Sequence, residues 1–291
     1  MIWKMFYIVW ILSQINGLKA DERCLDREKN QPTTCEMKTK VVIYCNTTDD
    51  LSKLNFDCEN LVPNGTKLER LILIFRNDMK AIKNELNLKS AFYNYKSLVL
   101  IQMNDIDLDV DLFAQLPASK TVSLSIMDSQ LKLIKNGMPI NDDASQCSPE
   151  MFSNTKSIFG RFKSIQFSNT VPFNGTKLCP FMFKDAILKM LTISGYESVD
   201  KLTFFDSNDQ DLNFKVDTIE FSEINRLKLE RNFLRTIFTS ATFITIVNSQ
   251  LVSIDSNAFE DMRRLRGFYI YEMEFAQFYA TFLQNISFPR R

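Results

Sequence analysis

The chain contains no histidine, only 7 glycines and 2 tryptophans among 291 residues, and no net charge, because 35 Lys and Arg balance 35 Asp and Glu. Without histidine there is no Ser-His-Asp or Cys-His catalytic site, no HExxH zinc motif and no histidine pH switch. The balanced charge provides no basic field for a phosphate backbone, so we expect no nucleic-acid partner. A hydrophobic content of 45% is nevertheless normal for a chain that buries a core.

Long hydrophobic runs are also missing, and the one apolar run of note lies at the amino end. Residues 1–20 hold an early lysine, an apolar run from Met5 to Leu12, and small or polar residues up to Ala20. This order is typical of a signal peptide, and the run is about half of the roughly 20 residues that span a bilayer. We expect a secreted, extracellular product without a membrane span after signal removal, with a retained anchor as the weaker alternative.

The cysteines and glycosylation acceptors fit an oxidising compartment. An even number of cysteines after a signal peptide indicates disulfides, and their spacing lacks the CxxC pairs of zinc sites, so no metal is expected. The cysteines are Cys24, Cys35, Cys45, Cys58, Cys147 and Cys179. The Asn-x-Ser/Thr acceptors are Asn46, Asn64, Asn174 and Asn285.

A short apolar pattern recurs between residues 68 and 273: an apolar residue, two positions, a second apolar residue, one position and a third. The middle residues stand at positions 71, 98, 122, 165, 191, 219, 244 and 268, so six of the seven steps are 24 to 28 residues long. The remaining step, of 43 residues, contains an insertion near residues 136–155. This period, combined with strand-like alternation, predicts a solenoid with one parallel strand per repeat.

An ordinary α/β domain is the alternative interpretation, because it also spaces apolar strands about 25 residues apart. That architecture requires amphipathic helices between the strands. Segments 136–150 and 168–180 do not have a helical pattern. The spacing therefore favours the solenoid.

The best copy of the repeat reads ATFITIVNSQLVSIDSNAFEDMRRL over residues 241–265. It resembles the extracellular leucine-rich repeat family, whose repeat runs LxxLxLxxNxLxxI and continues in longer repeats with xxxAFxxLxxL. The resemblance covers roughly residues 65–275. It implies an α/β leucine-rich repeat solenoid, a horseshoe with a curved parallel β-sheet on the concave side and a mostly irregular convex side.

The signal-peptide pattern, the cysteines and the resemblance together predict four segments. Residues 1–20 are the signal peptide, 21–64 a disulfide-stapled N-terminal cap, 65–273 a solenoid of about eight repeats, and 274–291 a C-terminal capping segment or a truncated end. In the cap, the strand-like run from Val41 to Tyr44 lies between Cys35 and Cys45, and the pairing of the four cap cysteines stays three-way ambiguous. In the last segment, apolar residues at helical spacing would cover the last repeat or form a dimer contact.

Two features depart from the family pattern. The turn position that the family fills with asparagine holds Thr170, Tyr196, Ile224 and Ser249. Asn77 and Asn104 fit that position only if the first two strands are read one residue later, which exchanges the buried and exposed sides. The register of the first three repeats therefore stays open.

Within the solenoid, Cys147 lies in the insertion and Cys179 in the next connection. A disulfide between them would tie two adjacent connections together. Free or intermolecular thiols are the alternatives.

No motif indicates catalysis. The acidic segment NDIDLDVD, residues 104–111, lacks the central glycine and the bidentate glutamate of a calcium loop, so we interpret it as a solvated strand or turn. GxGxxG, GxxxxGK[ST] and GxSxG motifs are absent. We expect no enzyme activity and no cofactor.

Binding is the function that remains, and the concave side of the sheet offers the candidates. Tyrosine is a frequent anchor because it buries a large area at low entropic cost. The candidate ligand-binding residues are Thr192, Glu220, Thr245, Tyr269 and Tyr271. The leading hypothesis is a secreted, non-catalytic leucine-rich repeat glycoprotein that binds a protein, or alternatively a glycan, in recognition, adhesion or immunity.

Two further hypotheses are a scaffold subunit of a secreted complex or homodimer, and a truncated receptor ectodomain. The sequence leaves the oligomeric state open.

Overall fold

The computed structural model describes part of the chain, and its strands form one parallel β-solenoid. The described residues are 40–45, 70–75, 96–102, 107–109, 123–135, 138–139, 147, 159–160, 162–172, 177–202, 204, 212–235 and 237–272. The signal peptide, most of the N-terminal cap, the segment 274–291 and all four glycosylation acceptors lie outside these residues. Among the residues described, no helix is long and apolar enough to cross a membrane.

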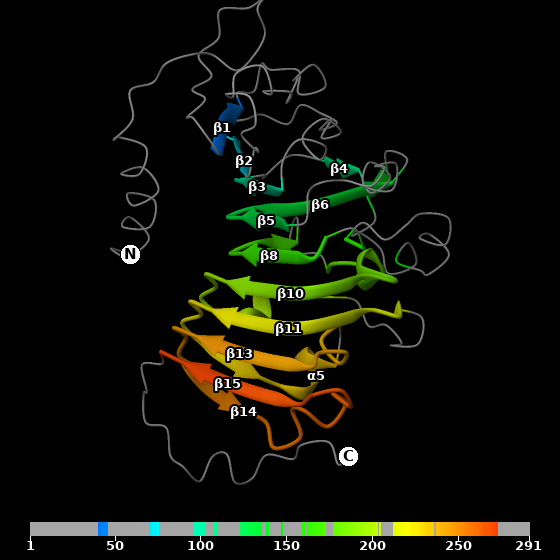
Figure 1. Ribbon diagram of the computed structural model, residues 1–291, viewed down its shortest axis with the longest axis vertical. Coiled ribbons are helices and arrows are strands. Elements are labelled where there is room, and N and C mark those ends of the chain that lie inside the picture. The colour runs from blue at the N-terminus through cyan, green and yellow to red at the C-terminus, as the bar shows by residue number, and fades with distance from the viewer. Residues whose placement is uncertain are drawn as a thin grey trace, which may run out of the picture.

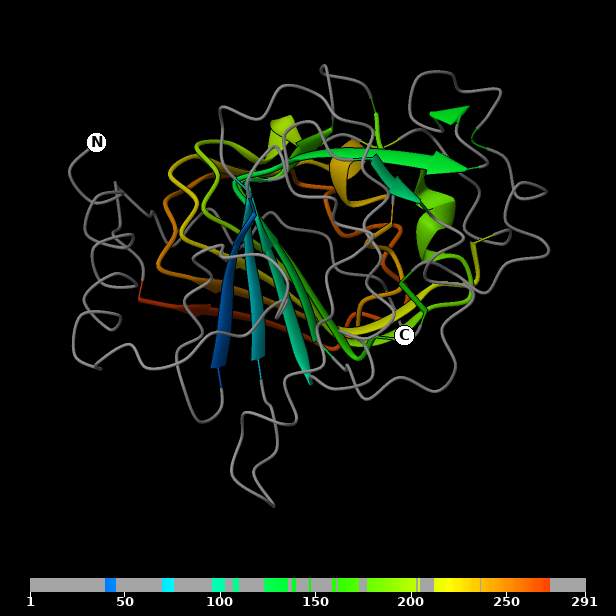
Figure 2. The same cartoon turned by 90° about the horizontal axis from the view of Figure 1, so that it is seen from above.

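The main sheet has nine strands, and every neighbouring pair is parallel. Its strands, in spatial order, are β1 (Lys40–Cys45), β2 (Arg70–Phe75), β3 (Ser97–Ile101), β5 (Ser123–Met127), β8 (Ser164–Ser168), β10 (Ile187–Ser194), β11 (Lys215–Ser222), β13 (Phe243–Val247) and β15 (Gly267–Tyr271). Figure 1 shows them stacked in sequence order, and Figure 2 shows how they fan out along the stack, as parallel strands twist.

Short elements form the opposite side of the coils where the structure describes it. The strands there are β4 (Asp107–Asp109), β6 (Gln130–Lys135), β7 (Met138–Pro139), β9 (Val171–Pro172), β12 (Leu227–Leu229) and β14 (Leu251–Ile254). The helical turns are η6 (Pro180–Phe183), η7 (Val199–Lys201) and α5 (Arg231–Leu234). The described solenoid is thus built from strands with little helix. The acidic segment NDIDLDVD contributes β4, which pairs with β6, in agreement with the strand interpretation.

The repeat markers lie side by side, as the period predicts. The row of paired residues is Leu71, Leu98, Leu124, Ile165, Leu191, Ile219, Ile244 and Phe268. One marker was wrong: the third repeat contributes Leu124 and not Val122, because Leu124 pairs with Leu98 and is fully buried.

The register of the early repeats is also settled. Leu98 and Leu100 are completely buried, whereas Val99 between them lies on the other face of the sheet at 7% exposure. Since Leu71 pairs with Leu98, the reading shifted by one residue to suit Asn77 and Asn104 is wrong. Upstream of these repeats, the run around Val41 joins the main sheet as its first strand, with Val41 paired to Leu71.

Phenylalanines connect successive coils through the core. The ring of Phe183 lies 5.0 Å from that of Phe159, 5.1 Å from that of Phe214 and 6.4 Å from that of Phe204. Phe204 in turn meets Phe238 at 6.3 Å in an edge-to-face contact. Each coil therefore completes its core with rings supplied by its neighbours, as stacked repeats require.

A left-handed residue follows almost every main strand and turns the chain. These residues have φ between 43° and 70°, and they are Gln102, Asp128, Asn169, Gly195, Glu223, Asn248 and Glu272. Each of the first six donates its amide hydrogen to the last residue of the next strand, which continues the ladder. Gly195 is the one glycine in this list. The other six residues carry a Cβ, and the left-handed conformation therefore costs them free energy that glycine does not lose.

In the turns after β8, β10, β11 and β13, the position that follows the left-handed residue holds Thr170, Tyr196, Ile224 and Ser249. The Ser249 hydroxyl accepts from the amide of Ile224 at 3.1 Å and donates to the carbonyl of Val247 at 2.9 Å. The Thr170 hydroxyl reaches the carbonyl of Ile126 at 2.9 Å, and the Tyr196 hydroxyl donates to the carbonyl of Thr170 and accepts from its amide. Buried hydroxyls thus satisfy turn groups that would otherwise be orphaned.

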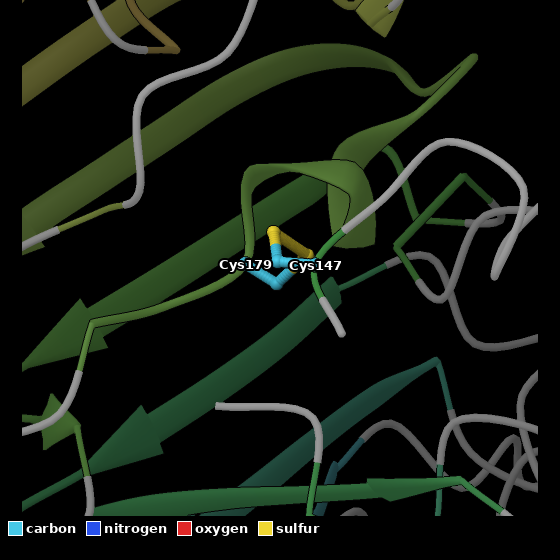
Figure 3. Close-up of a disulfide and its surroundings, with 2 residues drawn as sticks. All are labelled: Cys147 and Cys179. Atoms are coloured by element: carbon cyan, nitrogen blue, oxygen red, sulfur yellow. A yellow bond between two sulfur atoms is a disulfide. The ribbon is translucent and has the colours of Figure 1, made fainter. Parts of the chain in front are cut away.

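The predicted disulfide between Cys147 and Cys179 is present, with a Cα–Cα distance of 5.4 Å (Figure 3). Cys179 is fully buried directly before η6, whose four residues are all buried. The bond therefore attaches the inserted segment to the core. The pairing of Cys24, Cys35, Cys45 and Cys58 lies outside what the structure describes.

Candidate binding face

A buried and an outward side alternate clearly on β8, β11 and β13. On β8, Ile165 and Phe167 are buried, whereas Ser164, Gln166 and Ser168 point away from the core and are partly exposed. The same alternation holds on β11 and β13. We call the side of the main sheet that faces away from the core the outer face.

Parallel pairing brings four of the five predicted binding residues into a single line. Thr192 pairs with Glu220, Glu220 with Thr245, and Thr245 with Tyr269. The line continues upstream through Gln166, which pairs with Thr192. We call the residues Ser125, Gln166, Thr192, Glu220, Thr245 and Tyr269 the central row. The fifth candidate, Tyr271, lies two residues beyond Tyr269 on the same strand and face.

These residues differ in what they present to a ligand. Tyr269 is 44% exposed and Tyr271 is 53% exposed, whereas Thr192 is only 8% exposed. Glu220 and Thr245 are intermediate. Thr192 therefore belongs to the central row but offers little surface, and the accessible part of the prediction lies on β11, β13 and β15.

The centre of the outer face is a network of hydroxyls and one amide. The Gln166 side chain accepts from the Ser125 hydroxyl at 3.2 Å and donates to the Ser194 hydroxyl at 3.1 Å. Ser164 donates to Ser123 at 3.2 Å across the same strands. These groups satisfy one another, so the centre has fewer donors and acceptors left for a ligand.

Aromatic rings occupy the other end of the outer face, on β13 and β15. The ring of Tyr269 is 6.4 Å from that of Tyr271 with an interplanar angle of 14°, and 6.0 Å from that of Phe243. We call Phe243, Tyr269 and Tyr271 the aromatic end. Sequence reasoning missed Phe243, although its place two residues before Thr245 puts it on the same side of the strand.

Gly267 creates room for this arrangement. A Cβ atom at Gly267 would lie 2.8 Å from the Tyr269 hydroxyl and 2.9 Å from the Phe243 ring. The Tyr269 ring therefore lies over the backbone of its own strand and reaches Phe243. Sequence reasoning missed this glycine, for which the only signal was its position at the start of a strand.

The titratable side chains whose pKa values are shifted lie outside the central row and the aromatic end, and their contacts explain the shifts. The hydrogen bond from Arg231 lowers the pKa of Asp261, and the two side chains form a bidentate pair at 2.8 and 3.0 Å. Burial raises the pKa of the Tyr196 hydroxyl far above its usual value. No group of three or more His, Cys, Asp or Glu side chains is arranged for a metal ion in the described part of the chain.

Comparison with known proteins identifies no relative: no family model matches the chain, and no curated protein or solved structure matches it. The geometry of the outer face is therefore what indicates a function for this chain.

Proposed function

We propose that this protein is a secreted, non-catalytic binding protein of the leucine-rich repeat type, which recognises a protein partner through the outer face of its main sheet. The repeat spacing and the parallel row of markers support the repeat type. The buried hydroxyls of Ser249 and Thr170 support it further, because they bond turn backbone groups where the family uses asparagine. A curved horseshoe form and an N-terminal cap belong to the same proposal.

The observation that carries the proposal is the exposure of two stacked tyrosines in line with a carboxylate two strands away. Tyr269 and Tyr271 are the most exposed aromatic rings of the described residues, and large exposed rings are frequent anchors at interfaces. Glu220 lies in the same row two strands away, about 10 Å from Tyr269 between Cα atoms. A partner surface of ordinary size covers both.

Secretion and glycosylation complete the proposal. The disulfide between Cys147 and Cys179 favours an oxidising compartment, where such bonds persist. The signal-peptide pattern of residues 1–20 and the four glycosylation acceptors point the same way.

Site-specific photo-crosslinking tests the binding face. A benzoylphenylalanine is placed at position 271 on the outer face and, as the matched control, at position 252, because Val252 is 46% exposed on β14 at the opposite side. In extracellular extract, we expect one discrete crosslinked protein from position 271 and none from position 252. Glu220→Lys should remove the product. Equal products from both positions, or a product that survives Glu220→Lys, would refute the outer face as the site.

A second candidate function, a scaffold subunit or homodimer, is favoured by the last described coil. Leu265, Phe268 and Ile270 stay partly exposed, whereas Ile244 and Ile246 in the preceding coil are fully buried. A second subunit would cover this apolar end. Sedimentation of the full chain at micromolar concentration discriminates the two functions, since a monomer without a co-purifying subunit rejects the scaffold.

A further inference from the structure

Cations that are scattered in the sequence gather at one end of the main strands. They stand two or four positions before the residues of the marker row, on β3, β8, β10, β11 and β15. They are Lys96, Lys163, Lys189, Lys215, Arg264 and Arg266. All six side chains are exposed. Asp217 is the one anion at the equivalent positions among the described residues. We call these six residues the basic edge.

The other end of the same strands has the opposite charge. Among the residues described within three positions after a main strand, the charged ones are Asp128, Glu197, Glu223 and Glu272. All four are acidic and exposed. A strand of five residues separates the two ends by about 16 Å. The zero net charge of the chain therefore hides a strong separation of charge across the sheet.

The basic edge is continuous at its centre, from β8 to β11, and its six cations outnumber the single acidic residue there, Asp217, which lies beside Lys189. Lys163 and Lys189 are on adjacent strands, joined by a 2.7 Å hydrogen bond between the Lys189 amide and the Lys163 carbonyl. Within the described part of the chain, no ion pair joins any of these six cations to a carboxylate, whereas Arg231 pairs with Glu260 and Asp261. From β3 to β15 the edge extends about 29 Å across the strands.

We propose that the basic edge binds a linear sulfated polysaccharide, which lies across the strand starts along the axis of the solenoid. A line of cations about 29 Å long and one or two residues wide matches a thin polyanion. A planar anionic membrane over the outer face would meet the acidic edge as well and be repelled. The basic edge shares no residue with the aromatic end. The proposal for polysaccharide binding can therefore be tested separately from the proposed protein-binding face.

Heparin binding by the full chain tests the proposal. The test variant is Lys163→Gln with Lys189→Gln. The control variant is Lys177→Gln with Lys228→Gln, which removes the same charge from exposed lysines outside the basic edge. We expect the native chain to bind heparin at low salt and to release it as salt rises. The test variant should bind about tenfold more weakly, with a salt slope lower by about 2, and the control should bind as the native chain.

Three results would overturn the proposal. They are no heparin binding at low salt, equal losses in the test and control variants, and equal binding of chemically desulfated heparin. Phosphatidylserine vesicles serve as the competing polyanion, and vesicle binding without heparin binding would assign the basic edge to membranes instead. Crosslinking from position 271 should be unchanged in the test variant, which separates this site from the outer face.

Discussion

The two sides of β11 differ in burial and in how far their residues vary from strand to strand. On the buried side, Ile219 and Phe221 are fully enclosed, and their counterparts on β8, β10 and β13 are equally buried and equally apolar. On the outer side, the residue paired across the strands changes from Gln166 to Glu220 to Tyr269 along the central row. The buried side repeats, and the outer side varies.

If the outer face binds a partner as proposed, this contrast separates stability from recognition. A repeated apolar row lets each coil bury the next, and the stability is shared along the stack. An outer side that is free to vary can carry a hydroxyl network at the centre and exposed rings at the end. Substitutions on the two sides of one strand should therefore have different consequences.

Removing a ring from the buried side should have the largest effect. Phe221 contacts Phe238 at 6.1 Å and Phe233 at the same distance, so Phe221→Ala leaves a cavity in the core. We expect a loss of about 3 to 5 kcal/mol in the free energy of unfolding, measured by urea denaturation. Glu220→Gln, one residue away on the outer side, should change it by less than about 0.5 kcal/mol. Similar losses in both variants would contradict the division.

The disulfide should have a comparable or slightly smaller effect. Cys147 and Cys179 are 32 residues apart, and closing such a loop stabilises a protein by about 3 to 4 kcal/mol in the chain-entropy model. Cys147→Ala combined with Cys179→Ala should lower the urea midpoint accordingly, and peptide mapping of the native protein should recover the linked pair. A native midpoint in the double variant would show that the bond does not form.

The Tyr196 hydroxyl should have an intermediate effect that depends on pH. Tyr196→Phe leaves the amide and carbonyl of Thr170 without their partner, at a cost of about 1 to 3 kcal/mol near neutral pH. Because burial raises the folded-state pKa of this hydroxyl, its stabilisation is full below about pH 10 and is lost as the pH rises further.

Urea unfolding at neutral pH and at about pH 10.5 should therefore show a smaller alkaline loss in Tyr196→Phe than in the native chain. Tyr271→Phe is the control, because Tyr271 is 53% exposed. The free energy of unfolding of this variant should fall between the two pH values by the same amount as that of the native chain. Parallel alkaline losses in native and Tyr196→Phe protein would mean that this hydroxyl is not buried.

Gly267→Ala should change binding more than stability. The new Cβ would lie 2.8 Å from the Tyr269 side chain and 2.9 Å from the Phe243 ring. Both rings lie on the outer face and have room to shift, so we expect a loss of no more than about 1 kcal/mol in the free energy of unfolding. The displaced ring should lower the crosslinking yield from position 271, whereas Ser222→Ala on β11 should not. An unchanged yield would show that the position of the Tyr269 ring does not matter for the partner.

Period and alternation predicted most of the main sheet, because they depend on burial alone. The exceptions are the third repeat, whose marker is Leu124 and not Val122, and β1, which the sequence assigned to the cap. The row from Leu71 to Phe268 follows from spacing, and the disulfide between Cys147 and Cys179 follows from the same spacing. The sequence was ambiguous where both sides of a strand are apolar, as in the run Leu98-Val99-Leu100-Ile101. There the pairing of Leu98 with Leu71 and Leu124, and not the pattern, selected the buried side.

Other features had no signal in the sequence. In a sequence, Gly or Asn is the usual signal for a residue in the left-handed conformation. Here Gln102, Glu223 and Glu272 also adopt that conformation, so the turns could not be recognised. The basic edge brings together lysines such as Lys163 and Lys189, which are 26 positions apart in the chain. The sequence therefore contains no run of consecutive basic residues that would indicate it. The aromatic end depends on Gly267, whose role comes from a close approach in space.

The most direct test of the division between the two sides is the free energy of unfolding of Tyr269→Ala. Tyr269 is 44% exposed, and the account assigns its ring to recognition and not to the core. Urea denaturation should show a loss of no more than about 1 kcal/mol relative to the native chain. A loss of about 3 kcal/mol or more, as for a buried aromatic ring, would show that the aromatic end is part of the packing that closes the solenoid and would contradict the account.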